Sequence, residues 1–317
     1  MVVVDVDYIY TFFFKKPLYV MAGAGYTISM VAVLDDENLL KDTISKHGIV
    51  IITNVVDDTF CEGCRQMNYD LITELSCCTK HHECMKKLGP QERPWYFKSY
   101  VTNCDWLWQV RCNDNVRKVF STLHGTTDLV AGGDGFSYVP EGAPSTHRNK
   151  AHTVCGNKSD YVRYTGQLVL ATCPEVALHV STGIAGKIGR YIDGHSMQKF
   201  TVPEGALAIW NIDMYYANVV EVSPSSTHLA AFISYRGKHT MTERDFAARG
   251  NAYFGNRPTG LDLCSAISNG TTSNAPFERK SLIYDFNEGK VHPQQFYSRI
   301  RWPRNVLVVM KLIGQLD

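Results

Sequence analysis

The sequence lacks an excess of charge of either sign. The chain has 317 residues, with 32 Lys and Arg against 31 Asp and Glu, so its formal net charge at neutral pH is +1. Nucleic-acid-binding domains carry a concentrated basic surface, because Lys and Arg must neutralise the phosphates. The balanced composition therefore predicts no nucleic-acid partner. A near-neutral chain also lacks the repulsion that keeps copies apart, which favours self-association.

The amino terminus lacks the positively charged start of a secretory signal. Its first basic residues, Lys15 and Lys16, follow an apolar segment that contains acidic residues. We therefore expect no signal peptide and an intracellular protein, in the cytoplasm or nucleus. The uncharged run from Pro17 to Leu34 just reaches the length of a membrane span. Its Gly, Tyr, Thr and Ser content favours two short strands instead, so we expect no membrane partner.

Cysteine is present, but below the level of a disulfide scaffold. Ten cysteines occur in the chain, and an intracellular compartment would keep them as thiols. Cys61, Cys64, Cys77 and His81 have the spacing of a structural zinc site. Two other interpretations stay open. The cysteines could simply fill the apolar face of a helix, or they could form a disulfide within or between chains.

The first part of the chain predicts helices around one short strand. Asp35-Asp36-Glu37 is a good helix start and Gly48 a good helix end. The expected helices run from about 35–37 to Gly48, from 57 or 58 to 75, from 79 to 88, and from 113 to 123, with a buried strand at 49–53. Later in the chain we expect a short helix at 242–249 and a final strand at 305–313.

From Leu129 onward the pattern becomes β. Short apolar runs alternate with Gly, Pro, Asn and Ser, which is typical of a sandwich or barrel. Trp210 and Phe232 lie in two such runs, and we expect both side chains to be buried on paired strands. The sequence also has an aromatic-rich segment that includes Trp106 and Trp108. Without a basic surface beside it, this segment predicts core or interface packing rather than base stacking.

Five segments follow one another in an order that is informative. They are Gly135–Pro140, a polar loop at Pro144–Asn149, a strand-like Tyr164–Leu170, Val202–Asn211 and His228–Tyr235. This order resembles the phytanoyl-CoA dioxygenase-like branch of the Fe(II)/2-oxoglutarate oxygenases. The resemblance covers about residues 30–250.

The resemblance implies a mainly β, mixed α+β fold. Its core would be a double-stranded β-helix (a jelly roll, cupin-like) at about residues 129–236, packed on N-terminal helices. We therefore divide the chain into an N-terminal arm (1–29), a dioxygenase-like domain (30–250) and a C-terminal arm or extension (251–317).

The metal-site positions implied by the resemblance are substituted in this chain. The family holds iron with a His-x-Asp/Glu pair and a distal His, and an Arg binds the cosubstrate carboxylate. Here the pair reads His147-Arg148-Asn149, Tyr216 stands at the distal position, and His228 stands near the Arg position. Asn is a weak neutral ligand, and Tyr at neutral pH is a protonated phenol. We therefore expect no catalytic residue, no metal and no cofactor.

One alternative is that another histidine, such as His179 or His195, completes a site for Fe(II) and 2-oxoglutarate. Under that alternative the protein is an active Fe(II)/2-oxoglutarate-dependent dioxygenase with an atypical metal site.

The substitutions favour a different class of function, a non-catalytic structural protein derived from an oxygenase. The first 14 residues are apolar and β-prone, and such a strand left unpaired is an aggregation-prone edge. We therefore expect residues 1–29 and part of 251–317 to pack against other copies of the chain. A densely packed assembly, such as a viral occlusion body (polyhedrin-like) or a particle, would use arms of this kind.

Overall fold

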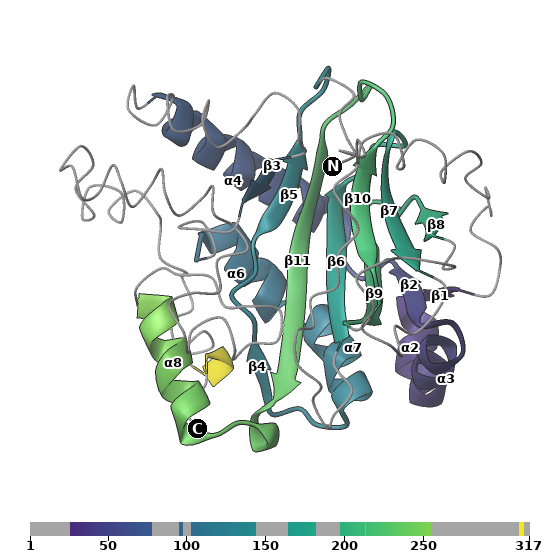
Figure 1. The fold of residues 1–317 in the computed structure, drawn as a ribbon, viewed down its shortest axis with the longest axis vertical. Helices are drawn as coiled ribbons and strands as arrows, with labels where there is room; N and C mark the ends of the chain where they lie inside the picture. Colours follow the sequence, from purple (N-terminus) through teal and green to yellow (C-terminus); the bar gives the residue numbers. More distant parts are fainter. Residues whose placement is uncertain are drawn as a thin grey trace, which may run out of the picture.

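The computed structural model describes residues 26–77, 95–97, 103–143, 164–181, 197–212, 214–254 and 311–313. Within these ranges the protein is a mixed α+β structure that consists mainly of sheet. Helices lie on one side of a large sheet, and a small sheet packs on its other side (Figure 1). The mainly β, mixed class predicted from the sequence is confirmed.

The helices begin and end at capping residues. The carboxylate of Asp36 accepts a hydrogen bond from the backbone N–H of Asn38 (2.9 Å), and Gly48 ends that helix with a left-handed φ of 73°. Asn113 and Gly125 cap a second helix in the same way. The described helices are α2 (Met30–Asp35), α3 (Glu37–His47), α4 (Asp58–Cys77), α6 (Asp105–Cys112), α7 (Asp114–His124) and α8 (Glu243–Phe254), with the 3-10 turn η1 (Lys238–Thr240).

The strands form two sheets. In the larger, the order is β1-β2-β9-β6-β11-β5-β3, and β4 also pairs with β11; the smaller has the order β10-β7-β8. The pairing of β1 with β2 is parallel, and the other described pairs are antiparallel. The strands are β1 (Thr27–Ser29), β2 (Ile49–Thr53), β3 (Trp95–Phe97), β4 (Leu129–Ala131), β5 (Phe136–Val139), β6 (Tyr164–Ala171), β7 (Val176–Ser181), β8 (Met197–Phe200), β9 (Leu207–Asn211), β10 (Tyr216–Val220) and β11 (His228–Gly237).

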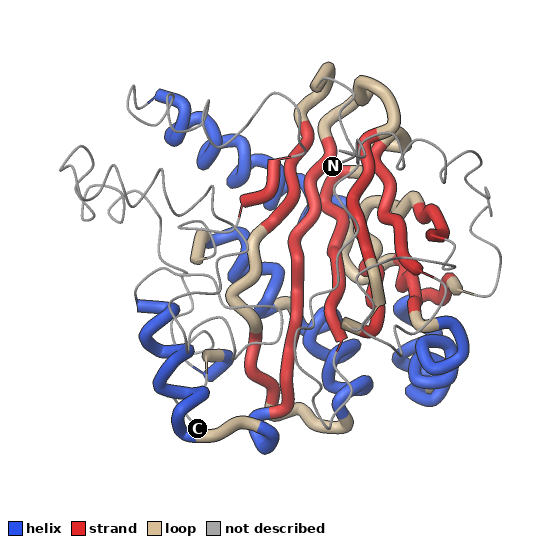
Figure 2. Tube along the Cα trace, in the orientation of Figure 1, coloured by secondary structure: helices blue, strands red, loops and turns tan. Residues whose placement is uncertain are grey.

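The two faces of the large sheet belong to two different cores, because side chains alternate along a strand. On β9, Leu207 and Ile209 pack in the cluster that contains the helices, whereas Ala208 and Trp210 pack in the cluster that contains β7, β8 and β10. We call the first side the helix face and the second the inner face. Figure 2 shows the helices and the small sheet on their separate sides of the large sheet.

The predicted burial of the large aromatic residues is confirmed. Trp210 on β9 and Phe232 on β11 are 0% and 1% exposed. Both strands pair with β6, in the middle of the large sheet. Trp106 and Trp108 on α6 are buried too, so core packing holds for this part of the aromatic-rich segment.

Three predicted secondary-structure segments differ from the structure at their carboxyl-terminal ends. Lys311 and Leu312 are helical and Ile313 lies in a turn, where the β-branched residues had predicted a strand. The uncharged run predicted as two strands ends in α2, because Ser29 accepts a hydrogen bond from the N–H of Ala32 and caps a helix. Helix α8 continues to Phe254, beyond the predicted end at 249. The predicted helix at 79–88 lies outside the described residues.

Parts of both predicted arms belong to the packed structure. Thr27–Ser29 pair with β2 in the large sheet. Leu312 and Ile313 are each 3% exposed within the helix-face core, and the guanidinium of Arg249 donates to the backbone oxygen of Leu312 (3.3 Å). The first 25 residues lie outside the described ranges, so the division into arms and domain stays a prediction.

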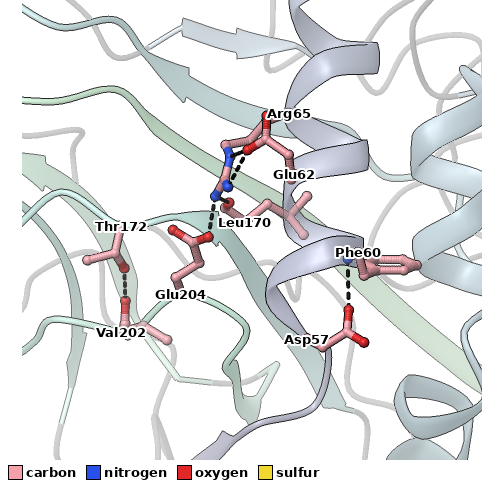
Figure 3. Close-up of polar contacts among 8 residues, drawn as sticks. All are labelled: Asp57, Phe60, Glu62, Arg65, Leu170, Thr172, Val202 and Glu204. Atoms are coloured by element: carbon pink, nitrogen blue, oxygen red, sulfur yellow. Dashed lines mark hydrogen bonds and ion pairs between the residues drawn. The ribbon is translucent and has the colours of Figure 1, made fainter.

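Arg65 ties helix α4 to the end of strand β6 (Figure 3). Its Nη1 donates to the backbone oxygen of Leu170 (2.9 Å), and the guanidinium also pairs with Glu62 (2.6 Å) and with Glu204. Glu204 belongs to the turn that leads into β9. This contact therefore connects the helix layer to two central strands, whose opposite face is the inner face.

No described helix combines the length and the apolar content that crossing a membrane requires.

Candidate functional site

The inner face of the large sheet carries polar side chains in an otherwise apolar layer. Ser137 on β5, Gln167 on β6 and His228 on β11 are 1%, 2% and 5% exposed. The alternation along each strand places them on the same side as Val139, Val169 and Ala230, which pack in the inner clusters. Buried polar groups are costly unless they are paired, so this layer is the candidate site.

Five buried polar atoms on this face make no hydrogen bond to a protein group. They are Ser137 Oγ, Gln167 Oε1, Trp210 Nε1, and both His228 ring nitrogens, Nδ1 and Nε2. Native structures pair the large majority of such atoms. Unpaired buried atoms also occur in the helix layer, for example Asn68 Oδ1, Trp106 Nε1 and Thr122 Oγ1, so they are not confined to the inner face.

His228 is an uncharged imidazole at neutral pH. Burial lowers the pKa of its side chain to about 4, and the nearby backbone of Ala171 offsets the effect only in part. A cosubstrate carboxylate needs a cation that remains charged when it is buried, which is the property of a guanidinium. His228 does not supply that charge, so the residue at the predicted cosubstrate position does not fit a dicarboxylate.

Tyr216 is an aromatic packing residue on β10. Its side chain is 1% exposed, and its ring lies 5.1 Å from the Trp210 ring at an angle of 45°. It belongs to the same apolar cluster as Trp210. A phenol in this position does not provide the imidazole that the iron site of the family requires. The residue at the distal position therefore does not fit the metal.

The structure does not bring Tyr216 and His228 together. Tyr216 lies at the start of β10, beside Trp210. His228 pairs with Val139, and Val139 packs against Val220 at the other end of β10. The two positions therefore lie towards opposite ends of the inner face.

Of the remaining predicted iron-site positions, the structure describes only His179. His147, Asn149 and His195 lie outside the described residues. His179 is on β7, where it pairs with Lys199 and Ala217. Its neighbours Leu178 and Val180 face the inner cluster, so His179 points away from it. That histidine is therefore unable to complete a site on the inner face.

The cysteines of α4 are buried thiols. Cys61 and Cys64 are both 0% exposed. Burial, together with the neighbouring thiols of Cys61 and Cys104, raises the pKa of Cys64 to about 12. Both side chains pack in the helix-face core, as the core interpretation of the pair expects.

The zinc set is only partly described. Cys77 is the last residue of α4, with its side chain beyond the described part, and His81 lies outside it. Within the described ranges, no three His, Cys, Asp or Glu side chains form a group that could hold a metal ion. The sequence reasoning had not connected Cys104 to Cys64, because the two residues meet only through the packing of α6 on α4.

Sequence reasoning had also missed Ser137 and Gln167. The signal was available in β6, where Gln167 interrupts a run of buried apolar residues. A single polar residue inside an apolar strand indicates a buried group that needs a partner. The neighbouring strands that complete the cluster could not be identified from that run alone.

The fold resembles solved structures. The crystal structure of the hypothetical protein JW0805 at high pH from Escherichia coli superposes with a TM-score of 0.52 and 12% identity, over 71% of this chain and 74% of that chain. The non-heme alpha ketoglutarate dependent carbocyclase SnoK from nogalamycin biosynthesis superposes less closely, with a TM-score of 0.45 and 12% identity, over 61% and 80%. At these identities the likeness is one of fold, and the SnoK comparison supports no argument about the chemistry of this chain.

No protein-family model matches the sequence, and a search of curated proteins finds no match.

Proposed function

We propose that this chain is a non-catalytic, self-assembling structural protein built on the jelly-roll scaffold of the Fe(II)/2-oxoglutarate oxygenases, in their phytanoyl-CoA dioxygenase-like branch. The motif order between Gly135 and Gly237 supports the ancestry. The two-sheet arrangement supports it as well, since a large and a small sheet with apolar inner faces are what a jelly roll requires.

One observation carries the non-catalytic part of the proposal. The two described positions that should bear an imidazole and a guanidinium bear a packed phenol and a neutral imidazole instead. Tyr216 is held against Trp210, and His228 is buried without a charge. Neither change leaves a group that could bind iron or a dicarboxylate in the usual way.

The assembly part rests on apolar surface near the amino terminus. Val31 and Leu34 on α2 are 65% and 52% exposed, and β1 forms an edge of the described large sheet. The preceding segment, residues 1–14, is rich in Val, Tyr and Phe. Edge strands and exposed apolar residues are the usual means by which one chain adds to another. An occlusion-body or particle protein is the most specific form of this proposal.

Turnover with iron and cosubstrate tests the catalytic question. Purified protein supplied with Fe(II), ascorbate and 2-oxoglutarate should release no succinate above a no-protein control. Robust release that His147→Ala abolishes would overturn the non-catalytic proposal. The matched control is His239→Ala, which changes an exposed histidine in η1 that belongs to neither proposed metal set.

Deletion of the amino-terminal segment tests the assembly question. The deletion should remove residues 2–25 and keep Tyr26 onward, because Thr27–Ser29 pair inside the sheet. We expect the wild type to form a higher-order state by light scattering, and the deletion variant to be folded but smaller. A monomeric wild type would contradict the proposal, and so would a deletion variant that keeps the same size.

A second candidate function is an active dioxygenase with an atypical metal site. The unpaired polar atoms on the inner face favour it, because enzyme sites keep such groups for substrates. Under this function Fe(II) and 2-oxoglutarate are the cofactors, and succinate release would separate it from the structural function.

A further inference from the structure

Strand β1 has an open edge within the described sheet. It pairs with β2 on one side, and no described strand pairs with it on the other. The backbone oxygen of Tyr26 accepts a hydrogen bond from the N–H of Ile51 (2.8 Å), so the backbone of Tyr26 faces β2. The backbone groups of successive strand residues point to opposite edges. The N–H and C=O of Thr27 therefore point away from β2, where a further strand would bind them.

Helix α2 follows this edge directly and has apolar side chains on two sides. Met30 and Val33 are buried in the helix-face core, whereas Val31 and Leu34 are 65% and 52% exposed. Residues three positions apart lie on the same side of a helix. Val31 and Leu34 therefore form one exposed apolar face, which we call the α2 face. It lies at the same margin of the large sheet as β1 (Figure 1).

The first 14 residues have the sequence pattern of a strand with one apolar face. Their even-numbered positions are apolar throughout, whereas their odd-numbered positions include two carboxylates and a hydroxyl. The even row is Val2, Val4, Val6, Tyr8, Tyr10, Phe12 and Phe14, and the odd row contains Asp5, Asp7 and Thr11. Successive side chains of a strand point to opposite faces. As a strand, this segment needs a sheet edge for its backbone and an apolar surface for its even row, and β1 and the α2 face offer both.

The exposure of the α2 face indicates that the covering strand comes from a second copy. Val31 and Leu34 remain exposed in the structure of the single chain. A strand supplied by the same chain would remove that exposure, whereas a strand from another copy arrives only on assembly. The donated segment and the receiving edge are different parts of the chain, so one copy can donate to the next while it receives from a third. Head-to-tail contacts of this kind build rings or filaments.

We propose that residues 2–14 of one copy add to the open edge of β1 in a second copy, with their even-numbered side chains over Val31 and Leu34. The backbone of Thr27 supplies hydrogen bonds that fix the position of the added strand. The apolar contact supplies most of the favourable free energy, because a hydrogen bond exchanged with water contributes little net. This inference rests on the proposed self-assembly and names the two surfaces that join the copies.

Photo-cross-linking in the full chain tests the contact. One version of the chain carries a benzophenone side chain in place of Leu34. A co-expressed version keeps Leu34 and has the change Val3→Ile, which makes its amino-terminal segment heavier by one methylene. Val3 belongs to the odd row, so this mark lies away from the docking face. Mass spectrometry after irradiation should find the benzophenone joined to residues 2–14, with a substantial share of the joined segments carrying the heavier mass.

The marked segment separates a second copy from the same chain. Cross-links confined to the lighter segment would show that each chain covers its own α2 face, and would overturn the proposal. Cross-links to other parts of the chain, or none, would overturn it too. The control places the same group at Tyr69 on α4, which is 66% exposed, and should not join residues 2–14. Equal cross-linking from both positions would mean that the segment has no preferred surface.

Charge on the α2 face tests whether the contact holds the copies together. Val31→Lys combined with Leu34→Lys places two cations under the apolar row and should reduce the particle size measured by light scattering to that of the single chain. The matched control is Tyr69→Lys combined with Val222→Lys, which adds the same charge at two other exposed apolar positions. It should leave the size unchanged, and circular dichroism should show that both variants are folded. An unchanged size for the first variant, or an equal loss in the control, would overturn the proposal.

The contact and the proposed function can fail separately. A higher-order state that persists without cross-links between Leu34 and residues 2–14 would leave self-assembly standing and remove only this contact. A wild type that light scattering shows to be monomeric would remove self-assembly itself. Succinate release is measured apart from both and decides the catalytic question alone.

Discussion

The helix face and the inner face of the large sheet are made by alternate residues of the same strands, yet they differ in chemistry. On the helix face, Leu168, Leu170 and Ile209 meet the apolar sides of α4, α6 and α7. On the inner face, Gln167 Oε1 and Ser137 Oγ lie among apolar neighbours and make no hydrogen bond to the protein. The comparison shows that buried polar side chains interrupt the inner face of strands whose helix face is mainly apolar.

The largest expected difference between the two faces comes from exchanging the polarity of two adjacent residues on β6. Leu168→Gln places an amide in the helix-face core and should cost about 3–5 kcal/mol of unfolding free energy. Gln167→Leu replaces an amide whose Oε1 is unpaired by an apolar group of similar size and should change the unfolding free energy by less than about 1 kcal/mol. Chemical denaturation measures both values. Equal losses would mean that the two faces do not differ.

A second test uses pH, because each side of the large sheet has one histidine whose pKa burial lowers. Burial lowers the pKa of His124 and of His228 from 6.5 to about 4. Between pH 6.5 and pH 4 the unfolded chain therefore binds protons that the folded chain does not, so stability falls as the pH falls. Each group contributes on the order of 3 kcal/mol to this loss. His228→Gln and His124→Gln should each flatten the stability curve measured from pH 7 to pH 4. A curve unchanged by either variant would contradict the buried, neutral state.

A third test concerns the turn that leads into β9. Gly205 has a φ of 73°, and a Cβ there would lie 2.6 Å from the backbone oxygen of Val56. Gly205→Ala should therefore cost about 2 kcal/mol or more, through both the strained backbone and the contact. Gly63→Ala is the control, since it lies inside α4 with open space around it and should stabilise by about 0.5–1 kcal/mol. Thermal unfolding that ranks the two variants in the opposite order would contradict the turn geometry.

The smallest expected effect is at Arg65, which joins α4 to the sheet (Figure 3). Its side chain is 31% exposed, so solvent screens the ion pairs with Glu62 and Glu204. Arg65→Met should cost about 1 kcal/mol or less. The loss should shrink in high salt, and denaturation at two ionic strengths measures it. A larger loss that does not depend on salt would show that the hydrogen bond to Leu170, rather than the charge, makes the connection.

Local patterns identified the elements of this protein well. Asp36 and Gly48 set the limits of α3, and Asn113 and Gly125 set those of α7, because caps act through bonds to residues a few positions away. Patterns failed at residues 311–313, where β-branched residues predicted a strand. There the helical turn is set by packing against the helix-face core, and tertiary contacts outweigh a weak local preference.

The candidate site was harder to predict than the elements. The sequence indicated Tyr216 and His228 as degenerate positions, and the structure gives both a buried place on paired strands. It could not indicate that they lie towards opposite ends of the inner face. The sequence also provided no indication that Ser137 lies near His228. The two residues are 91 positions apart in the chain and come close only because β5 pairs with β11.

The sequence by itself determined the ends of α3 and α7, the alternation of buried residues and the burial of Trp210 and Phe232, since these depend on local capping, on periodicity and on apolar character. Only the tertiary structure decided which residues of each strand face the helices and which face the small sheet. It alone decided that β1 pairs in parallel with β2 and that Gln167 lies beside Phe232. The reason is that strand pairing joins distant segments, and its register follows from the packing of both faces at once.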